Sequence, residues 1–221
     1  EKEMKYLYNS LKKPSKPTVL ILGGAKIYDK IALIDNMINK ITTILIGGSM
    51  AFTFLKVQGK NTGKSFIDGE CISIADKILR SAKKRKVNVI LPTDVVSAVT
   101  MSKNASVRVS TLNDLHSDES GFDIGPETIA NFEFILASAK TIIWNGPLGV
   151  CEIPLFTTGT KAIASAVRNR TEYGAISIIG GGDTASALKT TGINEGFSHI
   201  STGGGASLQL LSGRKLPAFE I

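Results

Sequence analysis

The residues best suited to chemistry form one short stretch, Gly180-Gly181-Gly182-Asp183-Thr184, which follows the apolar run at residues 175–179. This order predicts a strand, a tight glycine turn and the N-terminus of a helix. The first N–H groups of a helix are unpaired and carry partial positive charge, and glycines let a phosphate approach them closely. Asp183 has the position of an N-cap residue, but a carboxylate repels a phosphate unless a divalent cation lies between them. The stretch therefore indicates a Mg²⁺–phosphate site.

Two lysines are a second sign of an anionic ligand. Lys26 and Lys30 stand four residues apart, after a glycine pair, at the predicted start of a helix over residues 26–41. The macrodipole disfavours cations at a helix N-terminus, so their position indicates a bound anion rather than two solvated side chains. Between them, Asp29 either offsets their charge or holds water around a metal ion.

Short apolar runs alternate with amphipathic segments around these residues. The runs predict strands at residues 18–22, 43–46, 87–91, 141–144, 175–179 and 198–201. Helices are expected at residues 1–11, 26–41, 50–57, 70–84, 125–138 and 157–169, with one more after residue 182 and a last one ending at residue 211. Residues 92–114 look irregular and partly β, and residues 113–120 look like a polar loop. The alternation predicts a doubly wound α/β domain: a mainly parallel sheet with helices on both faces, in the three layers of a Rossmann-like fold.

Glycine clusters end five of the predicted strands, in the segments LILGGAK, ILIGGSM, IIWNGPLG, SIIGGGD and ISTGGGA. These segments hold 12 of the 22 glycines, more than short turns between strands and helices require. The carboxyl ends of parallel strands share one edge of the sheet, and ligands of open α/β sheets bind there. The sequence therefore predicts a crevice for a nucleotide or another phosphate ligand.

Length and composition narrow the class of protein. The chain has 221 residues, of which 43% are hydrophobic, enough for one sizeable core and one domain. No apolar run approaches the roughly 18 residues of a membrane-spanning helix. The net charge is +7, but its densest run, residues 83–86, ends a predicted helix, where cations are favourable, and no nucleic-acid motif accompanies it. We expect neither nucleic acid nor a membrane as a partner.

The cysteines and the N-terminus bear on the origin of the chain. Cys71 and Cys151 lie far apart without metal-ligand spacing, which predicts two free thiols in a reducing compartment. The charged N-terminal segment resembles a helix rather than a signal peptide. A chain that begins in this way is expected to be a fragment of a longer protein.

Two glycine motifs suggest other functions. The loop at residues 59–65 resembles a Walker A motif, but it has one residue too few between its glycines and no strand before it, so we interpret it as a basic surface loop. Residues 180–185 match the dinucleotide fingerprint G-x-G-x-x-A, which expects an acidic residue at the end of the next strand. The next strand ends in Ser201-Thr202-Gly203 instead. This weakens the prediction of nicotinamide binding.

Other polar residues are less specific. Glu152 follows the NGPLG turn and could accept hydrogen bonds from ribose hydroxyls, although a surface glutamate is the ordinary interpretation. His116 and His199 belong to no recognisable catalytic triad or metal set. Phosphoryl transfer requires only positioning and charge stabilisation by lysine, Mg²⁺ and backbone N–H groups, and the sequence supplies residues of that kind.

Together, these motifs resemble those of the phosphoglycerate kinase family. Five segments look like that family's, in its order: GGAKIYDKI, IGGSMAFTFLK, WNGPLGVCE, IIGGGDTASA and SHISTGGGASL. The resemblance is to the C-terminal, nucleotide-binding half. It implies that residues 1–13 are part of the helix joining two domains and that residues 14–221 are the nucleotide-binding domain. The N-terminal domain, which binds the phosphoglycerate and supplies a catalytic arginine in the family, is expected to be absent.

The resemblance also implies nucleotide-binding roles. Lys30 would bind nucleotide phosphate, Asn145 would lie near the phosphates, and Glu152 would hold the ribose. Asp183 would bind Mg²⁺. The adenine pocket would be lined by Gly24, Ala25, Gly47, Gly48, Gly121 and Phe122, and phosphate would be held by Thr184 with Gly180, Gly181 and Gly182.

The implied catalytic groups are Lys26, which would bind the phosphoryl group in flight, and a second helix N-terminus presented by Gly203, Gly204 and Gly205. The implied reaction is reversible phosphoryl transfer between 1,3-bisphosphoglycerate and Mg-ADP, giving 3-phosphoglycerate and ATP, in glycolysis or carbon fixation. The resemblance implies a cytoplasmic monomer, or a protein of a plastid or other organelle if a targeting segment precedes the chain. By itself the chain is expected to bind nucleotide with little activity.

Four residues depart from the family's usual pattern: Tyr28, Ser49, Phe122 and Cys151. None of them removes a charged catalytic group. Two alternatives stay open. One is an NAD-dependent oxidoreductase domain, which rests on the dinucleotide fingerprint. The other is a non-catalytic interaction domain, which rests on Tyr28, Ser49 and Cys151.

Overall fold

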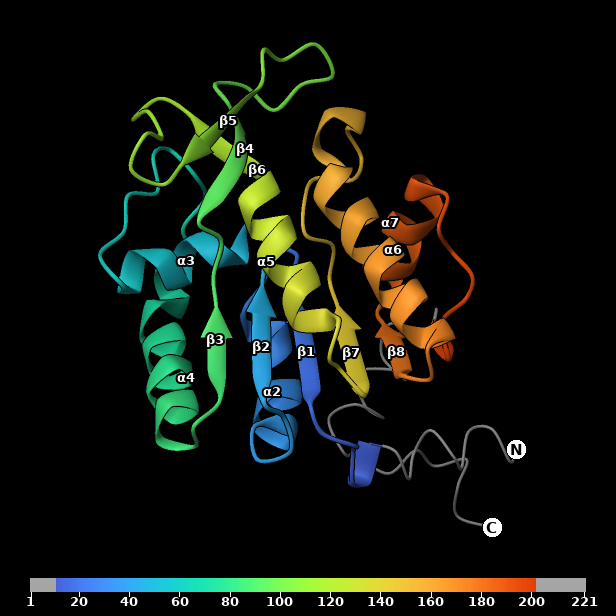
Figure 1. The fold of residues 1–221 in the computed structure, drawn as a ribbon. Helices are drawn as coiled ribbons and strands as arrows, with labels where there is room; N and C mark the ends of the chain where they lie inside the picture. The colour runs from blue at the N-terminus through green and yellow to red at the C-terminus, as the bar shows by residue number, and fades with distance from the viewer. Residues whose placement is uncertain (1–10, 202–221) are drawn as a thin grey trace.

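The computed structural model describes residues 11–201, and a six-stranded sheet runs through the middle of this part (Figure 1). All neighbouring strands are parallel, in the order β3-β2-β1-β7-β8-β9. Their bounds are β1 (Thr18–Leu22), β2 (Thr43–Ile46), β3 (Asn88–Ile90), β7 (Thr141–Asn145), β8 (Ile176–Gly180) and β9 (His199–Ser201). Because the strands are parallel, their carboxyl ends lie along one edge, as the sequence predicts.

Both faces of the sheet are buried. Every residue of β1, TVLIL, is buried, and alternate side chains belong to different cores. Leu20 and Leu22 pack in one hydrophobic cluster, whereas Val19 and Ile21 pack in the other. Continuous apolar strands of this kind are typical of a parallel sheet with helices on both faces.

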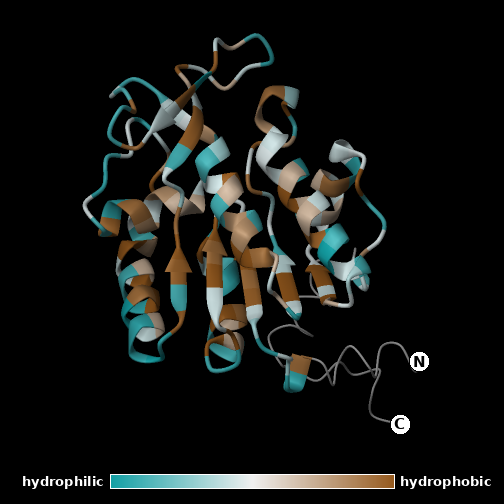
Figure 2. Cartoon of the chain, viewed as in Figure 1, coloured by the Kyte–Doolittle hydropathy of each residue, from teal (hydrophilic) through white to brown (hydrophobic). Residues whose placement is uncertain are grey.

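Within residues 11–201, six α-helices supply the covering layers. The first cluster contains side chains of α2 (Ile31–Met37), α3 (Met50–Val57) and α4 (Ile72–Lys84). The second contains side chains of α5 (Pro126–Leu136), α6 (Thr158–Glu172) and α7 (Gly182–Thr191). Figure 2 shows the apolar strands between helices whose outer faces are more polar. The expected doubly wound, three-layer α/β fold is confirmed.

A second, antiparallel sheet lies beyond the carboxyl ends of the parallel strands (Figure 1). Its order is β5-β4-β6, with β4 (Asp94–Ala98), β5 (Arg108–Thr111) and β6 (Ser120–Ile124). A small apolar cluster joins it to α3 through Phe52, Leu55, Val95, Leu112 and Leu115. The second sheet therefore forms one wall beside the edge where the glycine turns meet.

Some expected elements differ from the observed ones. The helix expected over residues 26–41 is shorter, because Tyr28–Lys30 form a 3₁₀ turn and α2 spans only Ile31–Met37. Residue 120, expected in a polar loop, begins β6. A 3₁₀ turn, Gly69–Cys71, precedes α4, and another, Pro154–Phe156, precedes α6. The expected helix at residues 1–11, apart from its last residue, and the one ending at residue 211 lie outside the described residues.

The expectations for the lysines at the end of α4 and for the two cysteines agree with the structure. Lys83 and Lys84 lie in the last turn of α4, where they complement the helix dipole. Cys71 and Cys151 are free and buried. Within residues 11–201, no helix is long and apolar enough to cross a membrane.

Candidate functional site

Three glycine turns interlock at the carboxyl edge of the parallel sheet. The N–H of Gly23 donates to the carbonyl of Asn145 at 3.0 Å, and the N–H of Gly24 donates to that of Pro147 at 2.7 Å. The N–H of Gly48 donates to the carbonyl of Leu148 at 3.0 Å. The turns after β1, β2 and β7 are thus hydrogen-bonded to one another. The fifth cluster, Gly203, Gly204 and Gly205, lies outside the described residues.

Glycine is required where these turns touch. A Cβ on Gly48, whose φ is +63°, would lie 2.5 Å from the nitrogen of Gly24. A Cβ on Gly146, whose φ is +101°, would lie 2.2 Å from the carbonyl oxygen of Gly23. Real Cβ atoms are not found at such distances, and positive φ is costly for other residues. The glycine clusters therefore bring three backbone turns into direct contact.

Lys30 and Asn145 connect the glycine turn after β1 to the glycine turn after β8, residues 180–182. The ammonium of Lys30 donates to Oδ1 of Asn145, and Nδ2 of Asn145 donates to the carbonyl of Gly180 at 2.7 Å. Burial lowers the pKa of Lys30 below its usual value, although the charges of Asp29 and Asp183 act in the opposite direction. A partly desolvated cation beside two glycine turns is a strong electrostatic partner for an anion.

The glycine turn after β8 leads into α7, whose N-terminus has no side-chain cap. The N-cap of α7 is Gly181, with φ +99°. Asp183 is not the N-cap that the sequence indicates; it lies in the first turn of α7 and is exposed. Thr184 is fully buried, and its hydroxyl accepts the N–H of Gly146 at 2.7 Å and donates to the carbonyl of Gly180 at 2.9 Å. The side chain of Thr184 therefore fixes the turn between β8 and α7.

Lys26 is exposed and precedes the 3₁₀ turn, so it is not in the first turn of a helix as expected. Lys30 ends the 3₁₀ turn and is the N-cap of α2. The macrodipole argument for Lys26 is therefore wrong, because the helix starts five residues later than expected. Tyr28 is also exposed, at 73% of its surface.

The residues expected around adenine surround only a narrow space. A pocket of about 10 Å³ is lined by Gly48, Gly121 and Phe122 together with Phe52, Pro92, Val95, Asp123, Ile124 and Leu148. A Cβ on Gly121 would lie 2.3 Å from Cζ of Phe52. Gly47 packs against Leu148 in the same way, and Ala25 is exposed. The structure thus groups Gly48, Gly121 and Phe122, with the ring of Phe52 packed against Gly121.

The loop that carries Glu152 is held from two sides. The N–H of Val150 donates to the carbonyl of Phe122 on β6 at 2.9 Å. Thr160, in the first turn of α6, accepts the N–H of Leu148 at 3.0 Å and the Cys151 thiol at 3.3 Å. Glu152 itself is exposed, so a fixed loop presents a free carboxylate beside the glycine turns.

The departures from the family pattern fit this arrangement without strain. Ser49 has φ −66° and ψ −25°, a helical conformation open to any residue. The ring of Phe122 packs on that of Phe156 with their centroids 4.9 Å apart. Burial raises the pKa of the Cys151 thiol, which is enclosed beside Thr160.

The expected Mg²⁺ site can be compared with the side chains that could act as metal ligands. Within residues 11–201, no group of three or more His, Cys, Asp or Glu side chains could form a metal cage. Mg²⁺ usually takes one or two carboxylates and completes its octahedron with water and phosphate oxygens. A single exposed carboxylate, Asp183, beside an uncapped helix N-terminus fits Mg²⁺ that arrives with a phosphate ligand.

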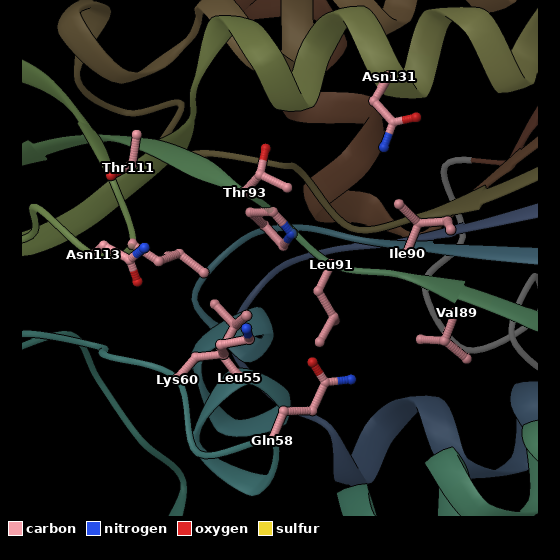
Figure 3. A pocket seen from close by; sticks show the side chains of 12 residues that line it. Leu55, Gln58, Lys60, Val89, Ile90, Leu91, Thr93, Thr111, Asn113 and Asn131 are labelled. Atoms are coloured by element: carbon pink, nitrogen blue, oxygen red, sulfur yellow. The ribbon is translucent and has the colours of Figure 1, made fainter.

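A larger groove lies elsewhere, with a volume of about 340 Å³ (Figure 3). It runs between the end of α3, the segment after β3 and the end of β5, and Leu55, Leu91 and Lys60 are among its lining residues. None of the glycine-turn residues lines it. Its size alone does not connect it with the chemistry at the sheet edge.

The sequence analysis missed several residues that shape the site. Ser65 accepts the N–H of Gly121 at 3.0 Å, Phe52 faces Gly121, and Asp123 accepts the N–H of Gly159 at 2.7 Å. The loop at residues 59–65, interpreted from the sequence as a basic surface loop, thus supports β6 through Ser65. For Asp123 the only signal in the sequence was a carboxylate inside an otherwise apolar run before Gly125-Pro126.

Comparison with known proteins identifies the family. The family model "Phosphoglycerate kinase" matches residues 1–214. The phosphoglycerate kinase of Chlorobium phaeobacteroides (strain BS1) is 48% identical over 217 residues, which cover 98% of this chain and 55% of that protein. That of Fervidobacterium nodosum is 45% identical over 218 residues, or 98% of this chain and 54% of that protein.

Solved structures agree. The phosphoglycerate kinase structure from Coxiella burnetii matches with a TM-score of 0.92 and 41% identity, covering 99% of this chain and 56% of that one. The one from Pyrococcus horikoshii OT3 matches with a TM-score of 0.83 and 28% identity, covering 98% and 54%. The chain thus spans about half the length of the relatives it matches. With a family model matched over nearly its whole length, this chain belongs to the phosphoglycerate kinase family.

Proposed function

We propose that this chain is the nucleotide-binding, C-terminal half of a phosphoglycerate kinase and that it binds Mg-ADP and Mg-ATP. In the complete protein it would transfer a phosphoryl group reversibly between 1,3-bisphosphoglycerate and ADP. Family membership supports the kinase assignment. Neither the dinucleotide-binding alternative nor the interaction-domain alternative is favoured by any observation at the site.

One arrangement carries the proposal: Lys30, Asn145 and the turn before α7 are joined by hydrogen bonds at the carboxyl edge of the sheet. The uncapped N-terminus of α7 offers N–H groups and a positive dipole end to a phosphate. The ammonium of Lys30 adds a full charge, and Asp183 attracts it across the turn. Such an arrangement holds phosphate through charge and backbone donors, as phosphoryl transfer requires.

Each residue of the site would then have its own role in binding the nucleotide. Lys30 and the α7 N-terminus would orient the nucleotide phosphates, and Asp183 would hold Mg²⁺, which neutralises phosphate charge when bound. The exposed Lys26 would reach the phosphoryl group, with Gly203, Gly204 and Gly205 as a further donor set. Glu152 would bind the ribose, and Gly48, Gly121 and Phe122 would bound the adenine.

The phosphoglycerate would be bound by a part of the protein outside this chain, so we expect the chain by itself to have little kinase activity. A coupled assay with 1,3-bisphosphoglycerate and ADP tests this expectation. Robust turnover by the 221-residue chain would contradict it.

The nucleotide site is tested by calorimetric titration with ADP, with Mg²⁺ and with EDTA. We expect saturable binding that Mg²⁺ strengthens. Asp183→Ala should remove most of the gain from Mg²⁺, ~2–3 kcal/mol for a charge-assisted contact. In EDTA it should bind ADP at least as well as the wild type, because a carboxylate near the phosphates is gone.

Asp76→Ala is the matched control. Asp76 is partly exposed on α4, where it pairs with Arg80 at 2.9 Å, so this variant loses the same charge away from the sheet edge. It should titrate like the wild type. Equal Mg²⁺ dependence in Asp183→Ala and the wild type would remove the metal role, and no ADP binding by folded wild-type chain would remove the proposed function.

A further inference from the structure

Asp123 is a buried carboxylate with no ion-pair partner within residues 11–201. It lies on β6 and exposes 4% of its surface. Its Oδ2 accepts the N–H of Gly159 at 2.7 Å, and its Oδ1 accepts the N–H of Ile124 at 2.9 Å. Burying a charge without a counter-charge is costly. If this position only filled space in the fold, an apolar residue would serve there. The presence of a carboxylate therefore indicates an additional role for Asp123.

Two glycines make room for this carboxylate. A Cβ on Gly149 or on Gly159 would lie 2.4 Å from Oδ1 of Asp123 in each case. Gly149 belongs to the loop over residues 146–152 that carries Glu152, and Gly159 lies in the first turn of α6. Asp123 therefore fills the junction between β6, the loop and the start of α6.

The same loop contacts the other turns of the candidate site. Its Pro147 and Leu148 carbonyls accept the N–H groups of Gly24 and Gly48, and its Val150 N–H donates to Phe122 on β6. A shift of this loop would move Glu152 relative to the glycine turns, which stay anchored to the parallel sheet. The position of Glu152 depends on how firmly β6 and α6 hold the loop.

We propose that Asp123 is a positioning residue for the nucleotide site, holding the loop over residues 146–152 so that Glu152 reaches the ribose. This inference rests on the proposed function. Asp123 is among the residues that line the narrow adenine pocket, but its effect on the ribose is indirect, because it acts through the Gly149 backbone and the first turn of α6. It therefore determines selectivity for the ribose hydroxyls rather than phosphate affinity.

The test compares the affinity for Mg-ADP with that for Mg-2′,3′-dideoxy-ADP in the 221-residue chain. The ratio of the two dissociation constants isolates the ribose contact, because adenine, phosphates and Mg²⁺ are common to both ligands. We expect the wild type to prefer ADP by about tenfold, as for a hydrogen bond to a charged group. Glu152→Gln should lower the ratio, and Asp123→Asn should lower it by a similar factor.

The double variant Asp123→Asn/Glu152→Gln should show a ratio no lower than that of either single variant, because both changes remove one contact. Asp94→Asn is the matched control. Asp94 is also buried and also accepts N–H groups of a helix start, those of Glu127 and Thr128 on α5, but it does not touch the loop. It should keep the wild-type ratio even if it lowers the melting temperature.

The pH dependence of the ratio in the wild type gives a measurement without any variant. Burial raises the pKa of Asp123 to about 7, against two backbone N–H donors that lower it. Below that pH one oxygen carries a proton and can no longer accept its N–H in the same way. The preference for ADP should therefore fall from pH 8 to pH 6, and phosphate ionisation cancels in the ratio.

If the losses of ADP preference in the two single variants add up in the double variant, the positioning role is overturned. It is also overturned if folded Asp123→Asn keeps the wild-type ratio of dissociation constants. A pH-independent ratio in the wild type would overturn it as well. Failure of the wild type to bind either nucleotide would overturn the proposed function together with this inference, whereas binding of ADP without any preference would overturn the inference alone.

Discussion

Lys30 and Asn145, which are 115 positions apart, are joined by a hydrogen bond from the lysine ammonium to Oδ1 of the amide. The amide nitrogen continues the connection to Gly180 at the end of β8. A charge placed by the turn after β1 is thus oriented by a side chain at the end of β7 and directed to the turn before α7. The order of the parallel strands makes this possible, because β1, β7 and β8 are neighbours.

Replacing Lys30 should separate function from stability. In Lys30→Met the apolar stem is kept and the charge is lost, so Mg-ADP affinity should fall by about 10- to 100-fold, the value of one to two charge-assisted hydrogen bonds. Burial already lowers the pKa of Lys30, so the native state gains little from this charge. The free energy of unfolding should change by less than about 1 kcal/mol, since the lost hydrogen bond and the relieved desolvation oppose each other.

Calorimetric titration and urea denaturation of Lys30→Met check both parts of this prediction. Lys40→Met is the control, because Lys40 follows α2, away from the sheet edge, and donates to Asn36 at 3.2 Å. It should leave affinity unchanged. Wild-type affinity in Lys30→Met would show that the ammonium does not face the nucleotide.

We expect that Gly181 cannot be replaced without loss, because its φ is positive and because Asn145 lies where a Cβ would be. Alanine at this position meets φ +99° and places a Cβ 2.9 Å from Nδ2 of Asn145. Gly174 is the matched control, with φ +91° and no atom within 4 Å of an added Cβ. Both alanine variants should lose roughly 1–2 kcal/mol of stability from backbone strain. Only Gly181→Ala should also weaken Mg-ADP binding, and equal affinities in the two variants would contradict the role of the turn.

Much of this architecture could be predicted from the sequence, for reasons that lie in local patterns. Buried parallel strands are continuous apolar runs, so β1 and β2 were predicted with the bounds that the structure shows. A glycine pair at the end of such a run is equally local. The grouping of Lys30, Asn145 and Asp183 followed, because parallel strands bring their carboxyl ends to one edge.

The missed features depend on contacts between distant segments. The strand β6, SGFDI, contains polar residues and a glycine, and its strand conformation comes from pairing with β4 rather than from its own pattern. The start of α2 was misplaced since residues 26–30 have helical periodicity but form a bend and a 3₁₀ turn. Asp123 accepts the N–H of Gly159, 36 residues away, and its local signal, a carboxylate in an apolar run, does not identify that partner.

Thr160 should be a stability determinant of the loop. Its hydroxyl is fully buried and accepts the N–H of Leu148. Thr160→Val keeps the shape but leaves that N–H unpaired, which should cost about 1–3 kcal/mol, whereas Thr160→Ser should retain most of the stability. Urea denaturation measures the difference. Thr190→Val, at an exposed position of α7, should change stability by less than about 0.5 kcal/mol. A valine at position 160 as stable as serine would show that the Leu148 N–H finds another acceptor.

The titration of Asp123 should make stability depend on pH in a recognisable window. Its pKa rises from 3.8 to about 7 on folding, chiefly through burial. Between these values the native state holds more of this proton than the unfolded state does, so the free energy of unfolding falls as pH rises, by at most about 1.4 kcal/mol per unit. Above pH 7 the contribution is constant, because the carboxyl is ionised in both states.

Asp123→Asn removes this slope, so the difference between the two unfolding curves isolates it from the other groups. Glu119 acts in the opposite direction: burial raises its pKa, but the Arg108 hydrogen bond, the His116 N–H and the Arg108 charge outweigh that effect. Its stabilisation is lost on acidification, in both proteins alike. Cys151, on the loop beside Asp123, has a thiol whose pKa is raised by burial, so it stays protonated throughout the window. Urea denaturation of both proteins from pH 4 to 8 should therefore show their stabilities changing relative to each other up to pH 7 and running parallel above it. Curves parallel from pH 4 onward would mean that Asp123 is ionised in the native state over the whole range, with its two N–H donors outweighing the cost of burial.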